Sequence, residues 1–177
     1  MQFQFDHDYH IHSYISPCSR DKEQTSENIL KKAKLAGLKQ VCLTNHLWAA
    51  ENHDPNHPTS FANVRKALPL PKDDQVDFLF GCEVDISWDG ILGITKDIYS
   101  AFDFIIVSTT HFHMLTFTVL EDQVSTDEKR AKLWVERFDK LLSFDLPFNK
   151  VGIPHLTTTI SNDTESALNV IRLIKEE

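Results

Sequence analysis

The sequence has no block of basic residues and no apolar run long enough to cross a bilayer. Its 177 residues include 18 lysines and arginines against 26 aspartates and glutamates, which gives a formal net charge of -8. This balance argues against a broad electrostatic surface for nucleic acid or for an anionic membrane. We therefore expect neither a membrane nor a nucleic acid as partner. An anionic substrate must then be attracted locally, for instance by metal ions.

A signal-peptide pattern is also missing, because Asp6, His7 and Asp8 interrupt any apolar run near the first residue. A cytoplasmic location is the default expectation. No internal repeat, low-complexity tract or linker divides the chain, and its 41% apolar content is ample for one core. We expect a single domain over residues 1–177.

Cysteine is scarce, and the three residues are an odd number at scattered positions. They do not make a disulfide framework. Cys42 and Cys82 lie inside apolar runs and are expected to be small buried hydrophobes. Cys18 differs because it follows Ser16-Pro17 in a loop shortly after His12.

Short apolar segments alternate with helical patterns along the chain. The predicted strands are residues 2–6, 40–44, 77–86, 103–108 and 150–153, and they lack the clean alternation of half-exposed strands. A helix capped by Thr25 or Ser26 and ended by Gly37 lies between the first two, and a shorter one covers about 60–68. Capping patterns at Ser125 and near Asp163 or Thr164 predict two later helices. The first of these later helices carries an apolar stripe expected to pack on the sheet, formed by Ala131, Trp134, Phe138, Leu141 and Leu142.

The histidines decide between an open doubly wound sheet and part of an α/β barrel. Candidate ligands follow all five predicted strands: His10 and His12, His46, Glu83, His111, and His155. In a barrel the C-terminal ends of successive strands surround one mouth. In an open sheet only the strands beside the topological switch point converge on a site. Ligands on five strands therefore favour the barrel.

These residue types suit a metal site. His10 and His12 lie two residues apart on an extended backbone, so both imidazoles point to one side. Glu83 lies within an apolar run, where an unpaired carboxylate is costly, and it can bridge two ions. Nitrogen and oxygen ligands suit zinc, manganese or iron. Two neighbouring ions can share a hydroxide nucleophile and neutralise a phosphoryl oxygen, which suits hydrolysis of a phosphate ester.

Other groups receive weaker roles. His113 is a second-choice ligand, and Asp85 is as readily an exposed residue as a functional one. His7, His53 and His57 are expected to be surface residues. A nucleophilic Cys18 beside His10 and His12 is a competing catalytic idea. No Gly-x-Ser-x-Gly motif supports acyl transfer.

The ordered motifs resemble the PHP (polymerase and histidinol phosphatase) superfamily of metal-dependent phosphoesterases over nearly the whole chain. The residues that carry the resemblance are Asp8-Tyr9-His10-Ile11-His12-Ser13, Ser16-Pro17-Cys18, Thr44-Asn45-His46, Gly81-Cys82-Glu83, Ser108-Thr109-Thr110-His111 and Gly152-Ile153-Pro154-His155. The resemblance implies an α/β fold, a distorted (β/α)7 TIM-like barrel with up to three divalent ions at its mouth. It also implies hydrolysis of a small phosphorylated substrate, histidinol phosphate being one example.

Carried over residue by residue, the resemblance implies three metal sites. His10, His12 and Glu83 hold the first ion, and Glu83 bridges to a second held by His111 and His155. On this basis Glu83, His111 and His155 are the expected catalytic set. The third ion uses His46 and Cys18, where relatives have His or Asp; a thiolate there shifts the metal preference.

The chain departs from the family after His155, where nothing matches the family's last motif, Asp-x-His. The expectation is a barrel that is incomplete at its C-terminal end, through truncation, completion by another subunit, or true reduction. An open barrel would expose a strand edge and favour a homodimer. Alternatives to phosphoester hydrolysis are a catalytically impaired metal-binding module with a regulatory or interaction role, and hydrolysis of a non-phosphate bond such as an amide.

Overall fold

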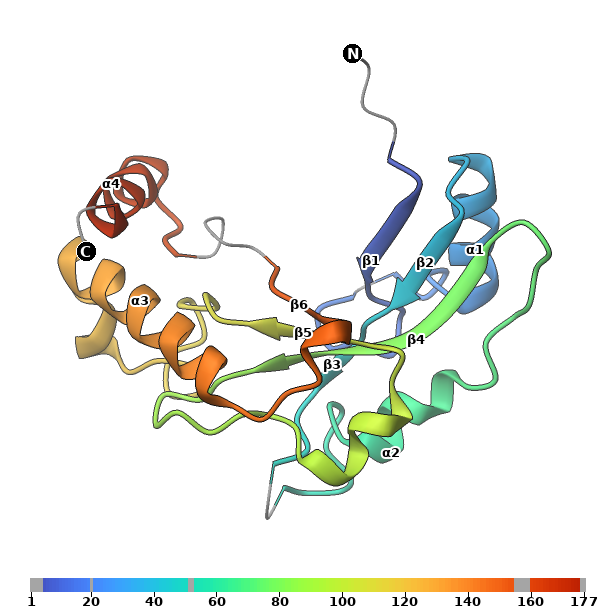
Figure 1. Ribbon diagram of the computed structural model, residues 1–177, viewed down its shortest axis with the longest axis horizontal. Coiled ribbons are helices and arrows are strands. Elements are labelled where there is room, and N and C mark those ends of the chain that lie inside the picture. The colour runs from blue at the N-terminus through green and yellow to red at the C-terminus, as the bar shows by residue number, and fades with distance from the viewer. Residues whose placement is uncertain (1–4, 20, 51–52, 155–159, 176–177) are drawn as a thin grey trace.

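The computed structural model describes residues 5–19, 21–50, 53–154 and 160–175, and a curled parallel sheet lies at its centre (Figure 1). Its strands are β1 (His7–Ile11), β2 (Gln40–Leu43), β3 (His46–Leu47), β4 (Asp77–Asp85), β5 (Phe104–Ser108) and β6 (Val151–Gly152). The α-helices are α1 (Ser26–Leu35), α2 (Phe61–Val64), α3 (Asp127–Ser143) and α4 (Thr164–Ile174). Short 3₁₀ helices cover Arg65–Ala67, Lys96–Ala101, Glu121–Val124 and Phe148–Lys150.

Strands β2 and β3 are one interrupted strand beside β4. Leu43 is in register with Phe80, and the same offset continues where His46 pairs with Glu83. The break falls at Thr44-Asn45, where the Asn45 carbonyl still accepts a hydrogen bond from Glu83 N at 3.1 Å. At this break the loop after β1 forms hydrogen bonds with Asn45 and His46.

The spatial order of the strands follows their order in the chain once β2 and β3 are counted together. The sheet runs β1-β2-β4-β5-β6, and every pair is parallel. A doubly wound sheet would reverse its order at a switch point. The curled sheet instead forms a half-barrel, as the barrel interpretation requires, while closure into a (β/α)7 barrel stays a prediction.

The first predicted strand was placed wrongly. Residues 2–4 of the predicted range lie outside the described residues, and Phe5 is 78% exposed and outside any strand. The strand is His7–Ile11, so that His10 lies within it. As the edge strand, β1 pairs only with β2 in the described part of the chain, and its first residues are exposed. An edge strand does not need the apolar run that guided the prediction.

The other predicted strands are confirmed to within about two residues at each end. Gly81 lets three of them approach closely, because a Cβ there would lie 2.5 Å from the Phe104 carbonyl and 2.6 Å from Cys42 Sγ. Cys42 and Cys82 are fully buried, as predicted. A core cluster packs Phe80 and Phe102 in a stack at 5.3 Å.

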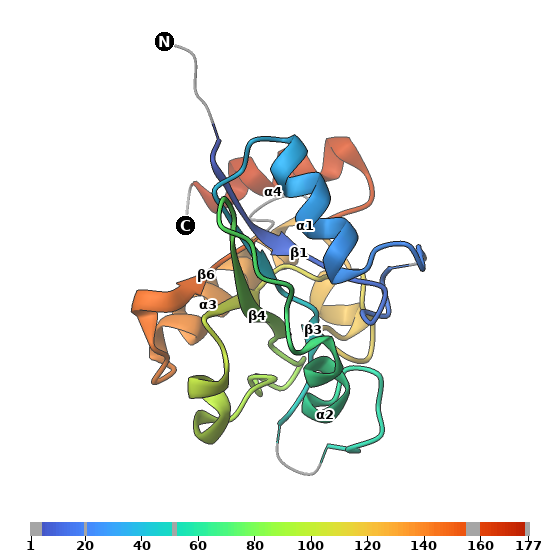
Figure 2. The ribbon, with the colours of Figure 1, turned by 90° about the vertical axis from the view of Figure 1, so that its right-hand side faces the viewer.

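The helices begin near the predicted caps. The Thr25 side chain caps α1, which packs Leu30 and Ala33 against Val41 of β2, and Asp163 caps α4. In the view of Figure 2 the ribbon of α1 lies in front of the sheet. For α3 the cap is Thr126, one residue later than expected. No helix within the described ranges has the length and apolar character needed to span a membrane.

The predicted stripe on α3 is only partly correct. Leu141 joins the core under the sheet, but Trp134 packs with residues of α4, and Leu142 is exposed. The reason is that α3 is covered by α4 along its first half, so its apolar side divides between two neighbours. The helical spacing predicted which residues of α3 share one face, but not whether they pack against the sheet or against α4.

Candidate metal centre

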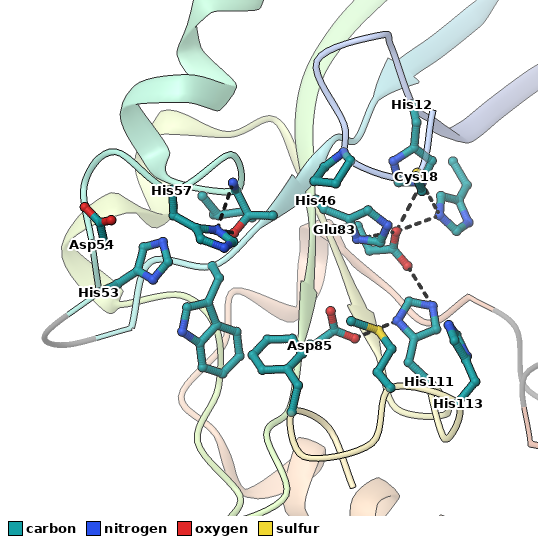
Figure 3. Close-up of a pocket in the computed structure, with 17 residues that line it drawn as sticks. His12, Cys18, His46, His53, Asp54, His57, Glu83, Asp85, His111 and His113 are labelled. Carbon is teal, nitrogen blue, oxygen red and sulfur yellow. Dashed lines mark hydrogen bonds and ion pairs between the residues drawn. The ribbon is translucent and has the colours of Figure 1, made fainter. Parts of the chain in front are cut away.

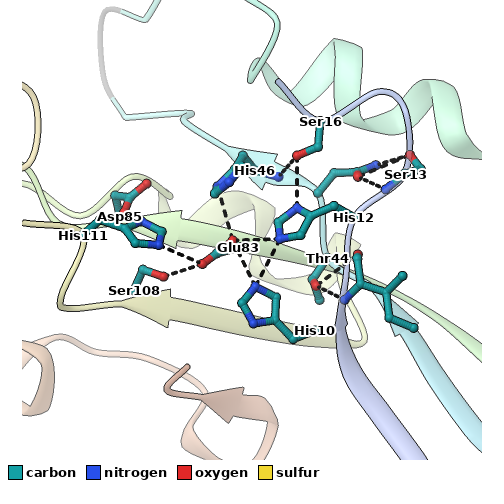
Figure 4. A network of polar contacts seen from close by, with 12 residues as sticks. His10, His12, Ser13, Ser16, Thr44, His46, Glu83, Asp85, Ser108 and His111 are labelled. Atoms are coloured by element: carbon teal, nitrogen blue, oxygen red, sulfur yellow. Dashed lines mark hydrogen bonds and ion pairs between the residues drawn. The ribbon is translucent and has the colours of Figure 1, made fainter. Parts of the chain in front are cut away.

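A single buried carboxylate, that of Glu83, is the centre of the site. Glu83 lies in the second half of β4 and is 1% exposed. Its Oε2 is 3.2 Å from His10 Nε2, 3.1 Å from His12 Nε2 and 3.3 Å from His46 Nδ1 (Figure 4). Three imidazoles from two neighbouring segments of the sheet therefore converge on one oxygen atom.

The other carboxylate oxygen of Glu83 faces β5 and the loop that follows it. Oε1 accepts a short hydrogen bond from Ser108 Oγ and lies 3.6 Å from His111 Nε2. Since the two oxygens face different groups, the carboxylate has the arrangement of a bridging ligand.

Side-chain hydrogen bonds fix the first loop against the break between β2 and β3. Asn45 Oδ1 accepts a hydrogen bond from Ser13 N at 2.8 Å. Ser16 Oγ lies 3.1 Å from His12 Nδ1 and accepts a hydrogen bond from His46 N, also at 3.1 Å. Ser13, Ser16 and Asn45 are buried. Together they hold His12 and His46 with their rings 4.7 Å apart.

His111 is oriented by Asp85, which from the sequence could equally have been an exposed residue or a functional one. Its Nδ1 lies 2.7 Å from Asp85 Oδ1, and both residues are buried. A carboxylate only accepts, so His111 donates from Nδ1 and directs Nε2 toward Glu83. Burial lowers the pKa of His111, but the hydrogen bond to Asp85 and the negative charges of Asp85 and Glu83 together outweigh burial, so the pKa is raised.

Cys18 completes a second group of donors. Its Sγ, a nitrogen of His12 and a nitrogen of His46 all lie within 4.8 Å of one another, as do the donor atoms of His10, His12 and Glu83. Hydrogen bonds with His12 and then His46 lower the pKa of the Cys18 thiol to about 5. The thiol is therefore a thiolate at neutral pH, which is the form that binds metals.

The charges within the site favour a cation. Burial lowers the pKa of His12, yet its hydrogen bonds with Cys18 and Glu83 raise the pKa to about 9. Burial raises the pKa of Glu83, but hydrogen bonds with His10 and His12 and the electrostatic attraction of His46 and His10 together outweigh burial and hold the pKa well below its usual range. A proton on His12 thus supplies the positive charge that the carboxylate and the thiolate require.

The donor set fits a divalent ion. His10 Nε2 and His12 Nε2 lie 3.1 Å apart, and each lies 3.1–3.2 Å from Glu83 Oε2. Two imidazole nitrogens at this distance need a cation or a proton between them, since two lone pairs would repel. Imidazole and carboxylate donors suit zinc, manganese and iron, and a thiolate adds preference for a softer ion.

The structure brings together six of the seven predicted ligands. His10, His12 and Glu83 form one group, and Cys18 and His46 join His12 in the other. His111 faces the second carboxylate oxygen of Glu83, Oε1. His155 lies outside the described residues. The exposed His113 lies beside His111, with ring centroids 5.4 Å apart, and belongs to neither donor group in the described part of the chain.

His57 is exposed, as expected of a surface residue, and His53 is half-buried. Both line the same pocket as the candidate metal ligands, a cavity of about 880 Å³ (Figure 3). The pocket also contains Trp48, Met114 and Phe117. No residue pattern signalled this shared pocket, because the positions of His53 and His57 depend on tertiary contacts.

Arg137 on α3 is a buried neighbour of the candidate site that sequence reasoning missed. It is 4% exposed and donates to the carbonyls of Ile86, at 2.6 Å, of Ser87, at 3.3 Å, and of Thr118. Thr118 in turn donates to the His111 carbonyl. Arg137 thus connects the end of β4 with the loop that carries His111. Its charged side chain on an otherwise amphipathic helix gave no reason to expect burial.

A model of one protein family matches the chain. The PHP domain matches residues 8–176. A search of curated proteins found no match.

Proposed function

The chain belongs to the PHP domain family, and from this premise we propose that it is a metal-dependent phosphoesterase that hydrolyses a small phosphomonoester. The observation that carries the proposal is the buried Glu83 carboxylate, whose Oε2 lies within 3.1–3.3 Å of three imidazole nitrogens. The half-barrel is then part of a distorted (β/α)7 barrel, with the site at its mouth. Histidinol phosphate is one candidate substrate among sugar phosphates and nucleotides.

The residues divide among the ions as follows. His10, His12 and Glu83 would hold one ion, and Glu83 with His111 would hold a second, completed by His155. Cys18 and His46 would hold a third. Zinc, manganese and iron are the candidates for a donor set of this kind, and such ions, when bound, supply Lewis acidity toward water and a phosphoryl oxygen.

The reaction consumes one water. The water oxygen forms a bond to phosphorus, the ester P–O bond breaks, and a proton passes to the departing oxygen, so that an alcohol and inorganic phosphate are released. The protein contributes position and charge: Asp85 orients His111, Ser16 orients His12, and Ser108 fixes one oxygen of Glu83.

The test compares Glu83→Gln with the unaltered protein. Both are freed of metal with a chelator, loaded with manganese or zinc, and assayed for phosphate release from p-nitrophenyl phosphate, with metal content measured on the same samples. We expect turnover in the unaltered protein and loss of at least about 100-fold in the variant. The neutral amide removes the bridging charge, and even a single outer partner of a metal ligand is worth 10- to 100-fold.

The matched control is Glu136→Gln, which changes an exposed carboxylate on α3 that pairs with Lys132 at 3.7 Å. It should retain full activity. Activity that survives Glu83→Gln would refute the bridging role. If the unaltered protein binds metal but hydrolyses none of several phosphoesters, the phosphoesterase proposal is refuted, and the protein is a non-catalytic metal-binding module.

A further inference from the structure

The pocket is much larger than the metal centre requires. Its volume of about 880 Å³ lies in the range of sites that enclose small organic ligands, whereas a phosphate group alone occupies only a small part of such a space. Figure 3 shows the metal ligands on one side and His53, Asp54 and His57 on the other. The second side has no role in holding metal among the described residues, where both donor groups lie on the first side.

Two aromatic residues of the pocket lining, Trp48 and Phe117, form an aromatic wall. Trp48 directly follows β3, and its ring meets Phe117 edge-on with centroids 4.7 Å apart. The backbone of Gly93 packs against the Trp48 ring so closely that a Cβ there would lie 2.6 Å from Trp48 Cε3. Trp48 and Phe117 are half-buried and line the pocket. The Trp48 ring is thus held in place while part of it faces the cavity, which suits packing against a flat ligand group.

The segment bearing His57 is tied to this wall. Trp48 N donates to the Thr59 carbonyl at 2.8 Å, and His57 N donates to the Asp54 carbonyl at 3.1 Å. The rings of His53 and His57 meet edge-on at 5.2 Å. The two histidines therefore have a defined place beside the aromatic wall.

The hydrogen bonds of His57 identify its free donor. Both hydrogen bonds of the His57 ring are at Nδ1, which lies 2.8 Å from Thr59 Oγ1 and accepts from Thr59 N–H, a group that can only donate, at 3.3 Å. Nδ1 is therefore the acceptor nitrogen, and the neutral ring carries its hydrogen on Nε2. Within the described residues this Nε2 makes no hydrogen bond. His53 is also under-satisfied, because its Nε2 is buried without a hydrogen-bond partner in the same part of the chain.

We propose that Trp48, Phe117, His53 and His57 form a leaving-group subsite that takes a flat ring carrying a hydrogen-bond acceptor. Resting on the proposed phosphoesterase function, this makes the substrate a phosphomonoester of an alcohol that bears an aromatic or heteroaromatic ring. The phosphate lies at the metal centre, the ring lies against Trp48 and Phe117, and its polar group accepts from His57 Nε2.

The test uses two esters with alcohols of similar basicity, ethyl phosphate and 2-phenylethyl phosphate, so that only the ring differs. We expect the metal-loaded protein to favour the phenylethyl ester by at least roughly tenfold in kcat/KM, since apolar pockets discriminate single methylene groups on that scale. Trp48→Ala should bring the ratio near one, and Phe117→Leu should lower it. Trp88→Ala is the matched control, because its exposed side chain lies outside the pocket, and it should leave the ratio unchanged.

The polar end is tested with the hydroxyphenyl analogues of the phenylethyl ester. The best of the three ring isomers should exceed the unsubstituted ester in kcat/KM, and His57→Ala should remove that advantage. His7→Ala, an exposed histidine outside the pocket, should preserve it.

Binding of 2-phenylethylphosphonate, which cannot be hydrolysed, gives a readout that does not require turnover. Calorimetric binding that Trp48→Ala weakens, in a protein that hydrolyses none of the esters, would support the subsite and overturn the phosphoesterase function. Hydrolysis of both esters at equal kcat/KM, with no effect of Trp48→Ala, would overturn the subsite and leave the proposed function intact.

Discussion

Asp85 and His111 form a buried pair in which Oδ1 of the carboxylate lies 2.7 Å from Nδ1 of the imidazole. The two residues come from different elements, Asp85 from the end of β4 and His111 from the loop after β5. Because Asp85 fixes the hydrogen of His111 on Nδ1, the lone pair of Nε2 is directed toward Glu83 and the metal site. Outer carboxylates of this kind raise the basicity of a histidine ligand.

Asp85→Asn should weaken divalent-ion affinity by about 10- to 100-fold, because the amide keeps the size of the side chain but loses the charge that polarises His111. Competition with a chromophoric chelator measures the affinity. Asp145→Asn, which alters an exposed carboxylate paired with Lys96, should leave the affinity unchanged. Equal affinities for all three proteins would show that Asp85 is not a partner of a metal ligand.

Cys18 should be the reactive thiol of the chain. Its thiolate is exposed at the pocket, whereas Cys42 and Cys82 are buried, and burial raises the pKa of both, to about 12 for Cys42. Iodoacetamide should therefore modify Cys18 alone in the metal-free folded protein. Zinc should protect it more than manganese, because thiolates prefer the softer ion.

Mass spectrometry of the alkylated protein measures this, and the two buried cysteines act as internal controls. Cys18→Ser should abolish labelling, and Cys18→Asp should shift the metal preference toward manganese. Labelling that proceeds at the same rate with and without zinc would remove Cys18 from the ligand set.

The strands of the sheet interior were the most predictable part of the fold. Residues 40–44, 77–86 and 103–108 are apolar because β2, β4 and β5 are covered on both faces. The placement of Glu83 and His46 together also followed from the sequence, because the ends of parallel strands meet at one edge. The position of the edge strand β1 was not predictable from apolar runs, since its first residues are exposed and are not apolar.

The partners of the ligands were not predictable in the same way. Asp85 lies two residues after Glu83, so alternation along β4 places both on one face, but its contact with His111 depends on how a distant loop folds back. Arg137 is similar, because its acceptors are backbone carbonyls that no residue pattern marks. The role proposed for His57 depends on the Trp48–Thr59 hydrogen bond, which only the folded chain shows.

The affinity for metal should rise with pH because a proton competes for His12. The pKa of His12 is raised from 6.5 to about 9 in the metal-free fold. The stability that the proton contributes is fully present below pH 6.5 and is lost as the pH rises through about 9. Metal binding requires the neutral imidazole, so the apparent affinity should increase by up to about tenfold per pH unit across this window.

Chelator competition at several pH values between 6.5 and 9 measures the affinity, and thermal unfolding of the metal-free protein measures the loss of stability. His12→Asn should flatten both dependences. An affinity that is constant over this range in the unaltered protein would mean that His12 carries no proton that metal displaces.

Arg137→Leu should lower the free energy of unfolding by at least about 3 kcal/mol, because it leaves buried carbonyls of Ile86, Ser87 and Thr118 without their donor. Arg137→Lys should lose less, since one ammonium can satisfy some of the three acceptors. The matched control is Arg130→Leu, which removes a more exposed pair with Asp127 at 2.9 Å and should cost about 1 kcal/mol or less. Urea unfolding of the three variants tests this ranking. If Arg137→Leu and Arg130→Leu were equally stable, the buried guanidinium would not be what holds the end of β4 to the loop of His111.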